Sequence, residues 1–146
     1  MDKIKIKKLN QNAVLPSRGT SFSAGLDLSA CIETDVEIKP NETKKIGTGI
    51  AIELEKNTVG LVFGRSGLGV KFGITLANCV GVIDSDYRGE IIVGLHNSST
   101  ESYTIKAGER IAQLVVVPIF LPEVVEVETL DETKRGENGF GSTGRL

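Results

Sequence analysis

The chain has 146 residues, the length of one ordinary domain, and its 17 Lys and Arg against 19 Asp and Glu give a formal net charge of −2. No basic block is long enough to hold a duplex through its phosphates, so we expect no nucleic acid polymer as a partner. The longest apolar run, around Leu114–Val117, is far shorter than the ~20 residues of a membrane span, and the N-terminus lacks the apolar core of a signal peptide, so we expect a single-domain cytoplasmic protein that does not enter a membrane.

Short segments with an apolar residue at every second position follow one another along the chain, the pattern of strands with one buried face. They run through Ile4 and Ile6, Val36 and Ile38, Ile46 to Leu54, Val59 to Phe63, Ile74 to Val80, and Ile91 to Leu95. A further segment, Ile111 to Val117, is apolar and β-branched, and turn residues separate the segments at Pro40-Asn41, Ala107-Gly108 and Leu121-Pro122. The chain is therefore predicted to fold as an all-β, jelly-roll-like barrel or sandwich.

One segment, Ser66–Val70, has the length of a helical turn but contains two glycines. Because glycine disfavours a helix, we predict a short turn there rather than a core helix. The two cysteines, Cys31 and Cys79, have neither metal-ligand spacing nor a disulfide framework around them, and we interpret both as reduced, small apolar fillers.

The last sixteen residues differ in character from the rest of the chain. Residues 131–146 contain four glycines from Arg135 onward and one large apolar side chain, Phe140, before the terminal Leu146. Such a segment cannot bury enough surface to order itself. We therefore predict a β domain over residues 1–130 and a mobile tail over 131–146 that orders when a ligand binds.

Five short, glycine-containing polar segments interrupt the predicted strands. They are AGLDLSA at 24–30, GRSGLG at 64–69, GVIDSDYRGE at 81–90, GERIAQLVVVP at 108–118 and RGENGFGSTGR at 135–145. In this order and over nearly the whole chain they resemble the five motifs of the trimeric dUTPase family. The resemblance implies a homotrimer with sites between its subunits. It also implies Mg²⁺-assisted hydrolysis of dUTP to dUMP and pyrophosphate, which lowers dUTP and supplies dUMP for thymidylate synthesis.

The tripeptide Arg65-Ser66-Gly67 offers a guanidinium, a hydroxyl and an unhindered backbone N–H within three residues, which suits a phosphate oxygen. Taken alone, such a tripeptide is more often a surface turn with a solvated arginine. The resemblance implies that it binds the α and β phosphates. Gln113 lies inside an apolar strand pattern, where an uncommitted amide is rare, so we expect it to face the ligand as a neutral donor.

The segment VIDSDYRG lies between two strand patterns, which places its acidic residues near the turn of a hairpin. Aspartate is also common at turns for purely local reasons. By resemblance, Asp84 is the base that activates the attacking water, Tyr87 packs against the deoxyribose, and Asn78 reads the edge of the uracil. The family likeness implies further substrate contacts from Val82, Ile83 and Ile92.

The tail has the composition of a phosphate-binding loop but lacks the G-K-[ST] ending of a Walker sequence. A flexible linker is the competing interpretation. By resemblance, Phe140 stacks on uracil, Arg135 meets the γ phosphate, and the tail closes over the substrate as a lid. The remaining expected substrate contacts of the lid are Gly141, Ser142 and Thr143.

Hydrolysis of a triphosphate builds charge on non-bridging oxygens, and Mg²⁺ held by the phosphates and waters disperses it. A dense carboxylate cage is not needed for such a metal. Asp27 in AGLDLSA is the candidate for a contact to a metal-bound water, and a structural aspartate at a strand end is the alternative. The single histidine, His96, has no partner at triad or ligand spacing, and we assign it no catalytic role.

Two other functions are compatible with a chain of this kind. The dCTP deaminases have a similar hairpin, but the position of their catalytic glutamate corresponds here to Gly94, and Glu90 lies four residues away. A non-catalytic nucleotide sensor is the second alternative, and the presence of Asp84, Gln113 and Arg135 together argues against it. Gly64 stands where many dUTPases have proline, and we expect no loss of phosphate contacts from that difference.

Overall fold

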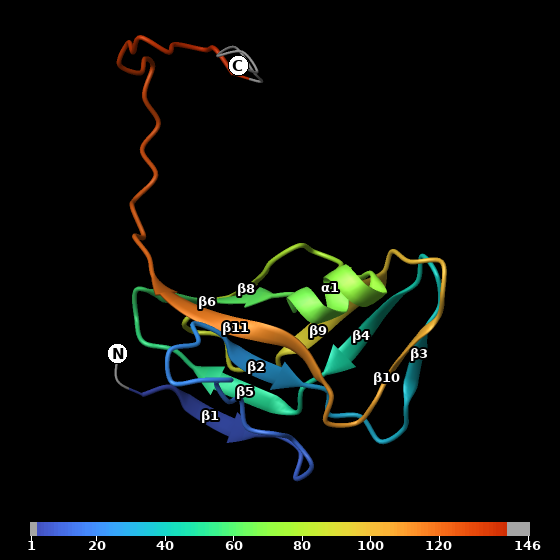
Figure 1. Cartoon of the computed structure of the whole chain (residues 1–146). Helices are drawn as coiled ribbons and strands as arrows, with labels where there is room; N and C mark the ends of the chain where they lie inside the picture. The colour runs from blue at the N-terminus through green and yellow to red at the C-terminus, as the bar shows by residue number, and fades with distance from the viewer. Residues whose placement is uncertain (1–2, 140–146) are drawn as a thin grey trace.

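The computed structural model describes residues 3–139, which contain eleven strands and one short helix. Figure 1 shows the strands wrapped into a single body from which the C-terminal part of the chain departs. The elements are β1 (Lys5–Lys8), β2 (Leu26–Ser29), β3 (Val36–Ile38), β4 (Thr43–Gly47), β5 (Ile50–Glu53), β6 (Thr58–Phe63), α1 (Ser66–Phe72), β7 (Ile74–Leu76), β8 (Gly81–Ile83), β9 (Ile92–Asn97), β10 (Tyr103–Ile105) and β11 (Arg110–Pro118).

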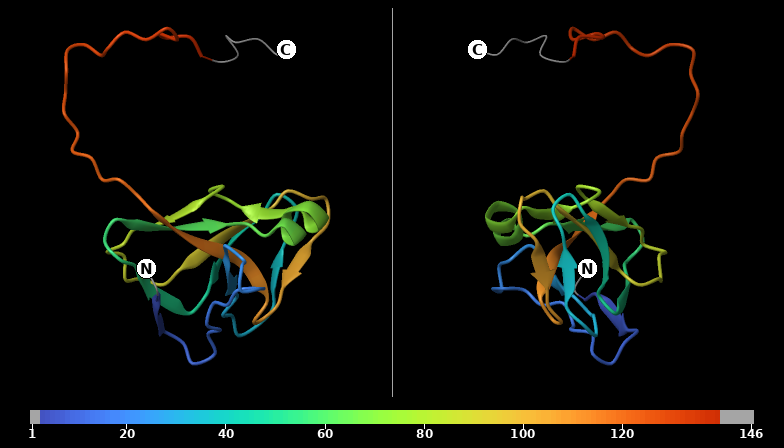
Figure 2. Two further views of the ribbon diagram at one scale, coloured as in Figure 1. Left: turned by 60° about the vertical axis from the view of Figure 1, so that its left-hand side comes forward. Right: turned by 90° about the vertical axis from the view of Figure 1, so that its right-hand side faces the viewer.

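All the strand pairings between these elements are antiparallel. The largest sheet has the order β2-β11-β6-β8, a second has the order β4-β9-β7, and β1-β5 and β10-β3 form two-stranded ladders. The two views in Figure 2 show these ladders surrounding one interior. The prediction of a single all-β domain is confirmed.

The core is built from the aliphatic side chains that the alternation pattern marked. Ile46, Ile50 and Ile52 are 1–2% exposed on β4 and β5, and Val93 and Leu95 are equally buried on β9. Burying a Val, Leu or Ile side chain contributes roughly 1.5–3 kcal/mol each, so this cluster is the main source of stability. The sheets that carry the candidate site are thereby held rigidly on one core.

The prediction of a turn at Ser66–Val70 was wrong, because Ser66–Phe72 forms the helix α1. Leu68 is 6% exposed and packs into the core, and Gly73 ends the helix in the left-handed conformation with φ 68°, donating to the carbonyl of Gly69 at 3.1 Å. This burial and this C-cap outweigh the cost of about 1 kcal/mol for each of two glycines in the helix.

The interpretation of both cysteines as fillers is correct for one of them. Cys31 is half-buried against the core, whereas Cys79 is exposed in the turn between β7 and β8 and has a φ of 61°. Neither forms a disulfide. The only helix within residues 3–139, α1, has neither the length nor the apolar composition to span a membrane.

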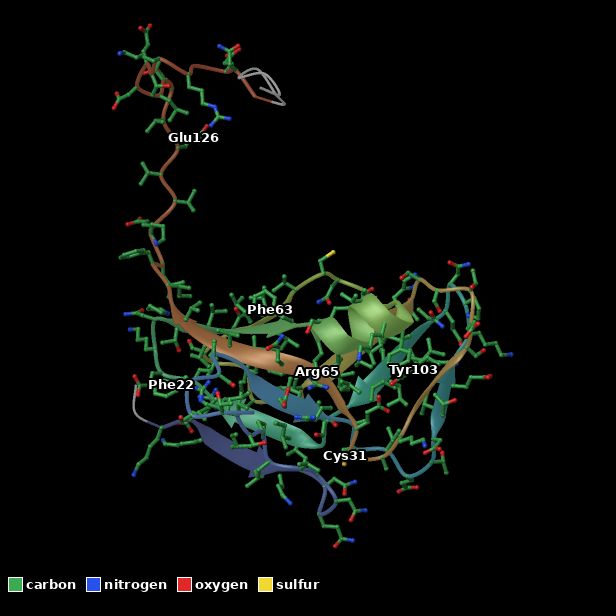
Figure 3. All side chains as sticks on the ribbon, in the orientation of Figure 1. Phe22, Cys31, Phe63, Arg65, Tyr103 and Glu126 are labelled. Atoms are coloured by element: carbon green, nitrogen blue, oxygen red, sulfur yellow. The ribbon has the colours of Figure 1, made fainter. Side chains whose placement is uncertain are left out.

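Residues 120–138 are exposed, and Figure 1 shows this segment leaving the end of β11 and running away from the body. Glu126, labelled in Figure 3, marks its middle. Its apolar side chains lie largely in solvent, among them Phe120 at 98% exposure and Val124 at 95%. The division of the chain at residue 130 and the mobility of the tail stay predictions.

Candidate active site

The pairing of three strands brings together residues that are far apart in sequence. On β11, Gln113 lies opposite Asp27 of β2 on one side and opposite Phe63 of β6 on the other. Arg65 follows the last residue of β6 by two positions. The same register therefore places it beside the end of β2. Figure 3 shows Arg65 at this place beside β2 and β11.

Asp27 is the electrostatic centre of this group. Its Oδ1 lies 3.1 Å from Nε of Arg65, and its Oδ2 accepts from Nη1 of Arg110 at 3.0 Å. Nη1 of Arg65 also donates to the main-chain carbonyl of Arg110 at 3.1 Å. The side chains of Asp27 and Arg65 are 16% and 29% exposed, so the pair is partly shielded from solvent. Two guanidinium groups and one carboxylate leave the group with net positive charge, which suits a phosphate.

Gln113 is half-buried, and its side-chain amide is hydrogen-bonded within the same group. Its Nε2 donates to the carbonyl of Gly64 at 2.9 Å. A Cβ at Gly25 would collide with the amide of Gln113 and would lie 3.1 Å from its Cβ. Gly25 does not have a left-handed φ, so its lack of a side chain serves to make room for Gln113. The amide is thus wedged between the first and second glycine-containing segments.

Ser66 and Gly67 are both exposed in the first turn of α1. A Cβ placed on Gly67 would have no described atom within 4 Å. The main chain at Gly67 is therefore open to a ligand, beside the guanidinium of Arg65.

A second group of predicted residues gathers along the segment from β7 to β9. The prediction of a hairpin around Asp84 was wrong, because β8 pairs with β6 and β9 pairs with β4 and β7 in another sheet. A cavity of about 360 Å³ is lined by Asn78, Ile83 and Ile92, together with Gly94. This volume lies within the ~300–1,000 Å³ of small-molecule sites. Val82 does not line it, because successive side chains of a strand point to opposite faces, and Val82 is 62% exposed on the far face of β8.

The turn after β8 is fixed by its own hydrogen bonds. The N–H of Tyr87 donates to the carbonyl of Asp84 at 3.1 Å, and Nη1 of Arg88 donates to the carbonyls of Ser85 and Tyr87 at 2.8 and 2.9 Å. The Asp84 side chain is exposed and faces an open hollow of about 660 Å³. The turn thus presents a carboxylate to solvent on a stiff support.

Within one chain, Asp84 does not reach the group around Arg65. Ile83 pairs with Gly60 on β6, and Arg65 lies five residues beyond Gly60 in the direction away from Asp84. Asp84 is one residue past Ile83 on the other side, so six residues separate it from Arg65 in strand register, roughly 20 Å at about 3.3 Å per residue. The structure therefore forms two groups of predicted site residues, one around Asp27 and Arg65 and one along the segment from β7 to β9.

The tail residues stand apart from both groups. Arg135 is exposed, and its Nε donates to the nearby carbonyl of Asn138 at 3.0 Å. Both figures of the whole ribbon show this segment away from the body. The other predicted tail residues, Phe140, Gly141, Ser142 and Thr143, lie outside the described residues.

Glu90, the acidic residue nearest the deaminase position, is held by contacts away from the cavity. Oε1 of Glu90 accepts the N–H of Gly49 at 2.7 Å and lies against Gly47, where a Cβ would be 2.6 Å from it. Gly94, at the deaminase position, lines the cavity between β7 and β9 without a functional side chain. This arrangement disfavours a deaminase.

Sequence reasoning missed Arg110, which shares the Asp27 carboxylate with Arg65. It lies in the segment GERIAQ, but only the register of β11 against β2, with its irregularity between Arg110 and Ala112, brings it to Asp27. Within residues 3–139, no group of three His, Cys, Asp or Glu side chains converges as a metal site. Asp27 is therefore a lone carboxylate among cations.

Comparison with known proteins identifies the family. The sequence model of the dUTPase family matches residues 11–144. The deoxyuridine 5'-triphosphate nucleotidohydrolase of Nautilia profundicola is 54% identical over 143 residues, covering 98% of this chain and 99% of that protein. The enzyme of the same name from Desulfitobacterium hafniense DCB-2 is 48% identical and covers 99% of both chains.

Solved structures agree with this assignment. The dUTPase of Staphylococcus bacteriophage 80alpha with dUpNHpp superposes with a TM-score of 0.90 at 31% identity, covering 99% of both chains. A dUTPase of phage phi11 of S. aureus, solved with a structural Mg(II) ion, has a TM-score of 0.82 at 26% identity, covering 90% of this chain and all of that one. From its motifs, its fold and these relatives, the chain belongs to the dUTPase family.

Proposed function

We propose that this protein hydrolyses dUTP to dUMP and pyrophosphate at sites assembled between the subunits of a homotrimer. The family membership, the relatives named dUTP nucleotidohydrolases and the phage dUTPase with dUpNHpp support the substrate and the reaction. In the proposed reaction Asp84 takes a proton from water, the water oxygen bonds to the α phosphorus, and the bond from that phosphorus to the β phosphate oxygen breaks. The products are dUMP and pyrophosphate.

The observation that carries the intersubunit site is the separation of Asp84 from Arg65. The roughly 20 Å between their strand positions is too long for one α phosphate to meet both the proposed base, Asp84, and the proposed phosphate clamp, the group around Arg65, of a single chain. A neighbouring subunit that brings the turn after its β8, with Asp84, to the Arg65 group would complete the site.

Exposed apolar surface supports the trimer independently. Val115, Val116 and Val117 are only half-buried on β11, and Val124, Val125, Val127 and Leu130 are 57–95% exposed on the segment that follows. Many exposed apolar side chains along one stretch of chain favour an interface. Neighbouring subunits would bury it.

The cavity between β7 and β9 is the proposed nucleoside site. Asn78 would hydrogen-bond the uracil edge, Ile83 and Ile92 would contact the base and sugar, and the ring of Tyr87 would pack against the deoxyribose. Val82 faces away from the cavity with its side chain and would contribute through its main chain only. Arg65, Ser66, Gly67 and Gln113 of another subunit would hold the phosphates.

Mg²⁺ fits the site as part of the substrate complex. Both oxygens of Asp27 form ion pairs with guanidinium groups, yet a carboxylate has about four lone-pair sites and can also accept from a metal-bound water. When bound to the triphosphate, Mg²⁺ disperses the charge that develops on the non-bridging oxygens. The structural Mg(II) ion of the phi11 enzyme supports metal binding in the family.

The tail, residues 131–146, is proposed to close over the occupied site. Arg135, Ser142 and Thr143 would meet the terminal phosphate with the main chain of Gly141, and Phe140 would stack on the uracil. Ordering such a segment costs on the order of 1 kcal/mol or more per residue, so closure requires the contacts that the triphosphate provides. The expected cellular role is to lower dUTP and supply dUMP for thymidylate synthesis in the cytoplasm, without a nucleic acid polymer or a membrane as partner.

One assay distinguishes this function from its alternatives. The protein is incubated with Mg²⁺ and either dUTP or dCTP, and dUMP, pyrophosphate and ammonia are measured. The proposal predicts dUMP and pyrophosphate in equal amounts from dUTP and no ammonia from dCTP. Ammonia from dCTP would indicate a deaminase, and tight binding of dUTP without products would indicate a sensor.

A further inference from the structure

Gly89 lacks a side chain for a reason other than its backbone conformation. The described glycines with a left-handed φ are Gly49, Gly73, Gly108 and Gly136, and Gly89 is not one of them. An L-residue could therefore adopt the backbone conformation at position 89 without strain. What excludes a side chain there is a contact.

That contact is with the ring of Tyr87. A Cβ placed on Gly89 would lie 3.0 Å from Cε2 of Tyr87 and would collide with Cζ and Oη. The hydroxyl of Tyr87 donates to the main-chain carbonyl of Glu90 at 3.0 Å. The ring thus folds back across residue 89, held at its hydroxyl end by residue 90.

The support under this ring is rigid because Glu90 and Ile91 are tied to the turn between β4 and β5. The carboxylate of Glu90 accepts from the N–H of Gly49 at 2.7 Å. Oγ1 of Thr48, which is 1% exposed, donates to the carbonyl of Ile91 at 2.6 Å. The carbonyl that receives the Tyr87 hydroxyl therefore cannot move without breaking these bonds.

We propose that Gly89 is a specificity-determining positioning residue, which gives the Tyr87 ring the one orientation in which it fills the space of a 2′-hydroxyl. This inference rests on the proposed packing of Tyr87 against the deoxyribose. A methyl group at position 89 occupies the volume in which the ring lies, so the ring of a Gly89→Ala protein must turn away. The 2′ position is then open, and a ribonucleotide is no longer excluded.

The test measures kcat/KM for dUTP and for UTP with the full-length protein. Gly89→Ala should lower the ratio of kcat/KM for dUTP to kcat/KM for UTP by about tenfold or more. A shape-selective pocket discriminates against a substrate with one additional hydroxyl by roughly 10²-fold, and the variant should lose much of this discrimination. Gly19→Ala is the matched control, because a Cβ at Gly19 meets nothing closer than Ser23 Oγ at 3.6 Å. The ratio for this control should equal that of the wild type.

The Tyr87→Ala variant distinguishes failure of the proposed role of Gly89 from failure of the proposed role of Tyr87. Tyr87→Ala should lower the ratio at least as much as Gly89→Ala, and the double variant should equal Tyr87→Ala within twofold. An unchanged ratio in Tyr87→Ala would overturn the proposed role of Tyr87. A lowered ratio in Tyr87→Ala with an unchanged ratio in Gly89→Ala, or independent effects that multiply in the double variant, would overturn the role of Gly89 alone.

If Gly89→Ala does not fold, the double variant shows whether Gly89 acts through the Tyr87 ring. If the new methyl group collides with the Tyr87 ring, removal of that ring in the double variant must restore the folded protein, as measured by circular dichroism and the thermal transition. A double variant that stays unfolded would show that Gly89 serves the fold and would contradict the proposal.

Discussion

The carboxylate of Asp27 lies 3.1 Å from the guanidinium of Arg65, and the same carboxylate accepts from Arg110 at 3.0 Å. The three residues come from β2, from the link between β6 and α1, and from the start of β11. One carboxylate therefore sets the position of two cations that face the proposed phosphate site. Its contribution should be visible in substrate binding more than in stability.

Asp27→Asn keeps the shape of the side chain and removes its charge. We expect KM for dUTP to rise and the Mg²⁺ concentration for half-maximal activity to increase, with a stability loss of only about 1 kcal/mol, as for partly exposed ion pairs. Steady-state kinetics across a Mg²⁺ titration measures both effects. The control is Glu53→Gln, which breaks the exposed Lys5–Glu53 pair away from the site. Equal Mg²⁺ dependence in the wild type and Asp27→Asn would leave Asp27 a purely structural residue.

Asp84→Asn should keep the fold and nucleotide binding and should lower kcat by ~10² to 10⁴-fold, the usual effect of removing a general base. Asp86→Asn is a matched control, because Asp86 is an exposed carboxylate of the same turn and lines the same hollow. Single-turnover rates and the affinity for dUpNHpp measure the two properties separately. Turnover within threefold of the wild type in Asp84→Asn would refute its assignment as the base.

Removal of residues 131–146 should leave the β domain intact. The hydrogen bonds within the described part of this segment are local, from Gly136 to Thr133 and between Arg135 and Asn138. We expect an unchanged melting temperature and a fall in kcat of about 10²-fold, because alignment of the substrate is lost. Full activity of the truncated protein would assign the tail to the linker interpretation.

Proteolysis tests the lid in the full-length protein. Trypsin should cut after Lys134 or Arg135, both exposed, and dUpNHpp with Mg²⁺ should slow that cleavage. Equal cleavage rates with and without the nucleotide would show that the segment does not close on it.

Asn97→Ala should destabilise the fold without acting on specificity. Asn97 is fully buried, and its Nδ2 donates to the carbonyls of Ile38 and Glu101 at 2.9 and 2.7 Å. Its loss leaves these carbonyls without that partner, which costs about 1–3 kcal/mol. Urea unfolding measures the change, with the exposed Asn12→Ala as control. A midpoint equal to that of the wild type would contradict the importance of this bond network.

The sequence predicted the fold class because alternation of apolar residues reports directly on which strand faces are buried. It failed where tertiary packing decides the outcome. Leu61 and Phe63 were assigned to an alternating face, but Gly60 and Val62 face the core there, with a Cβ at Gly60 within 3.3 Å of Leu114 and Leu54. The helix α1 was missed because its two glycines disfavour a helix, whereas the burial of Leu68 that stabilises it depends on the tertiary fold.

The family motifs predicted which residues gather in the candidate site. Asp27, Arg65 and Gln113 come together as the family likeness implied, and Asn78, Ile83 and Ile92 share one cavity. The contribution of Arg110 follows from a long-range strand register that one sequence does not encode in any local pattern. The contacts that exclude a side chain at Gly25 and Gly89 come from Gln113 and Tyr87 packed over them, and this packing follows from the tertiary fold.

The central claim is that the base and the phosphate clamp of one site come from different subunits, and mixing two inactive variants tests it most directly. Asp84→Asn and Arg65→Ala proteins are unfolded, combined in equal amounts and refolded together, and dUTP hydrolysis is measured. If subunits assemble at random and each site takes Asp84 from one chain and Arg65 from another, about a quarter of the sites are intact, and the mixture should show about that share of wild-type activity. Activity no higher than that of the two parents, in a mixture shown by light scattering to contain trimers, would contradict the intersubunit site.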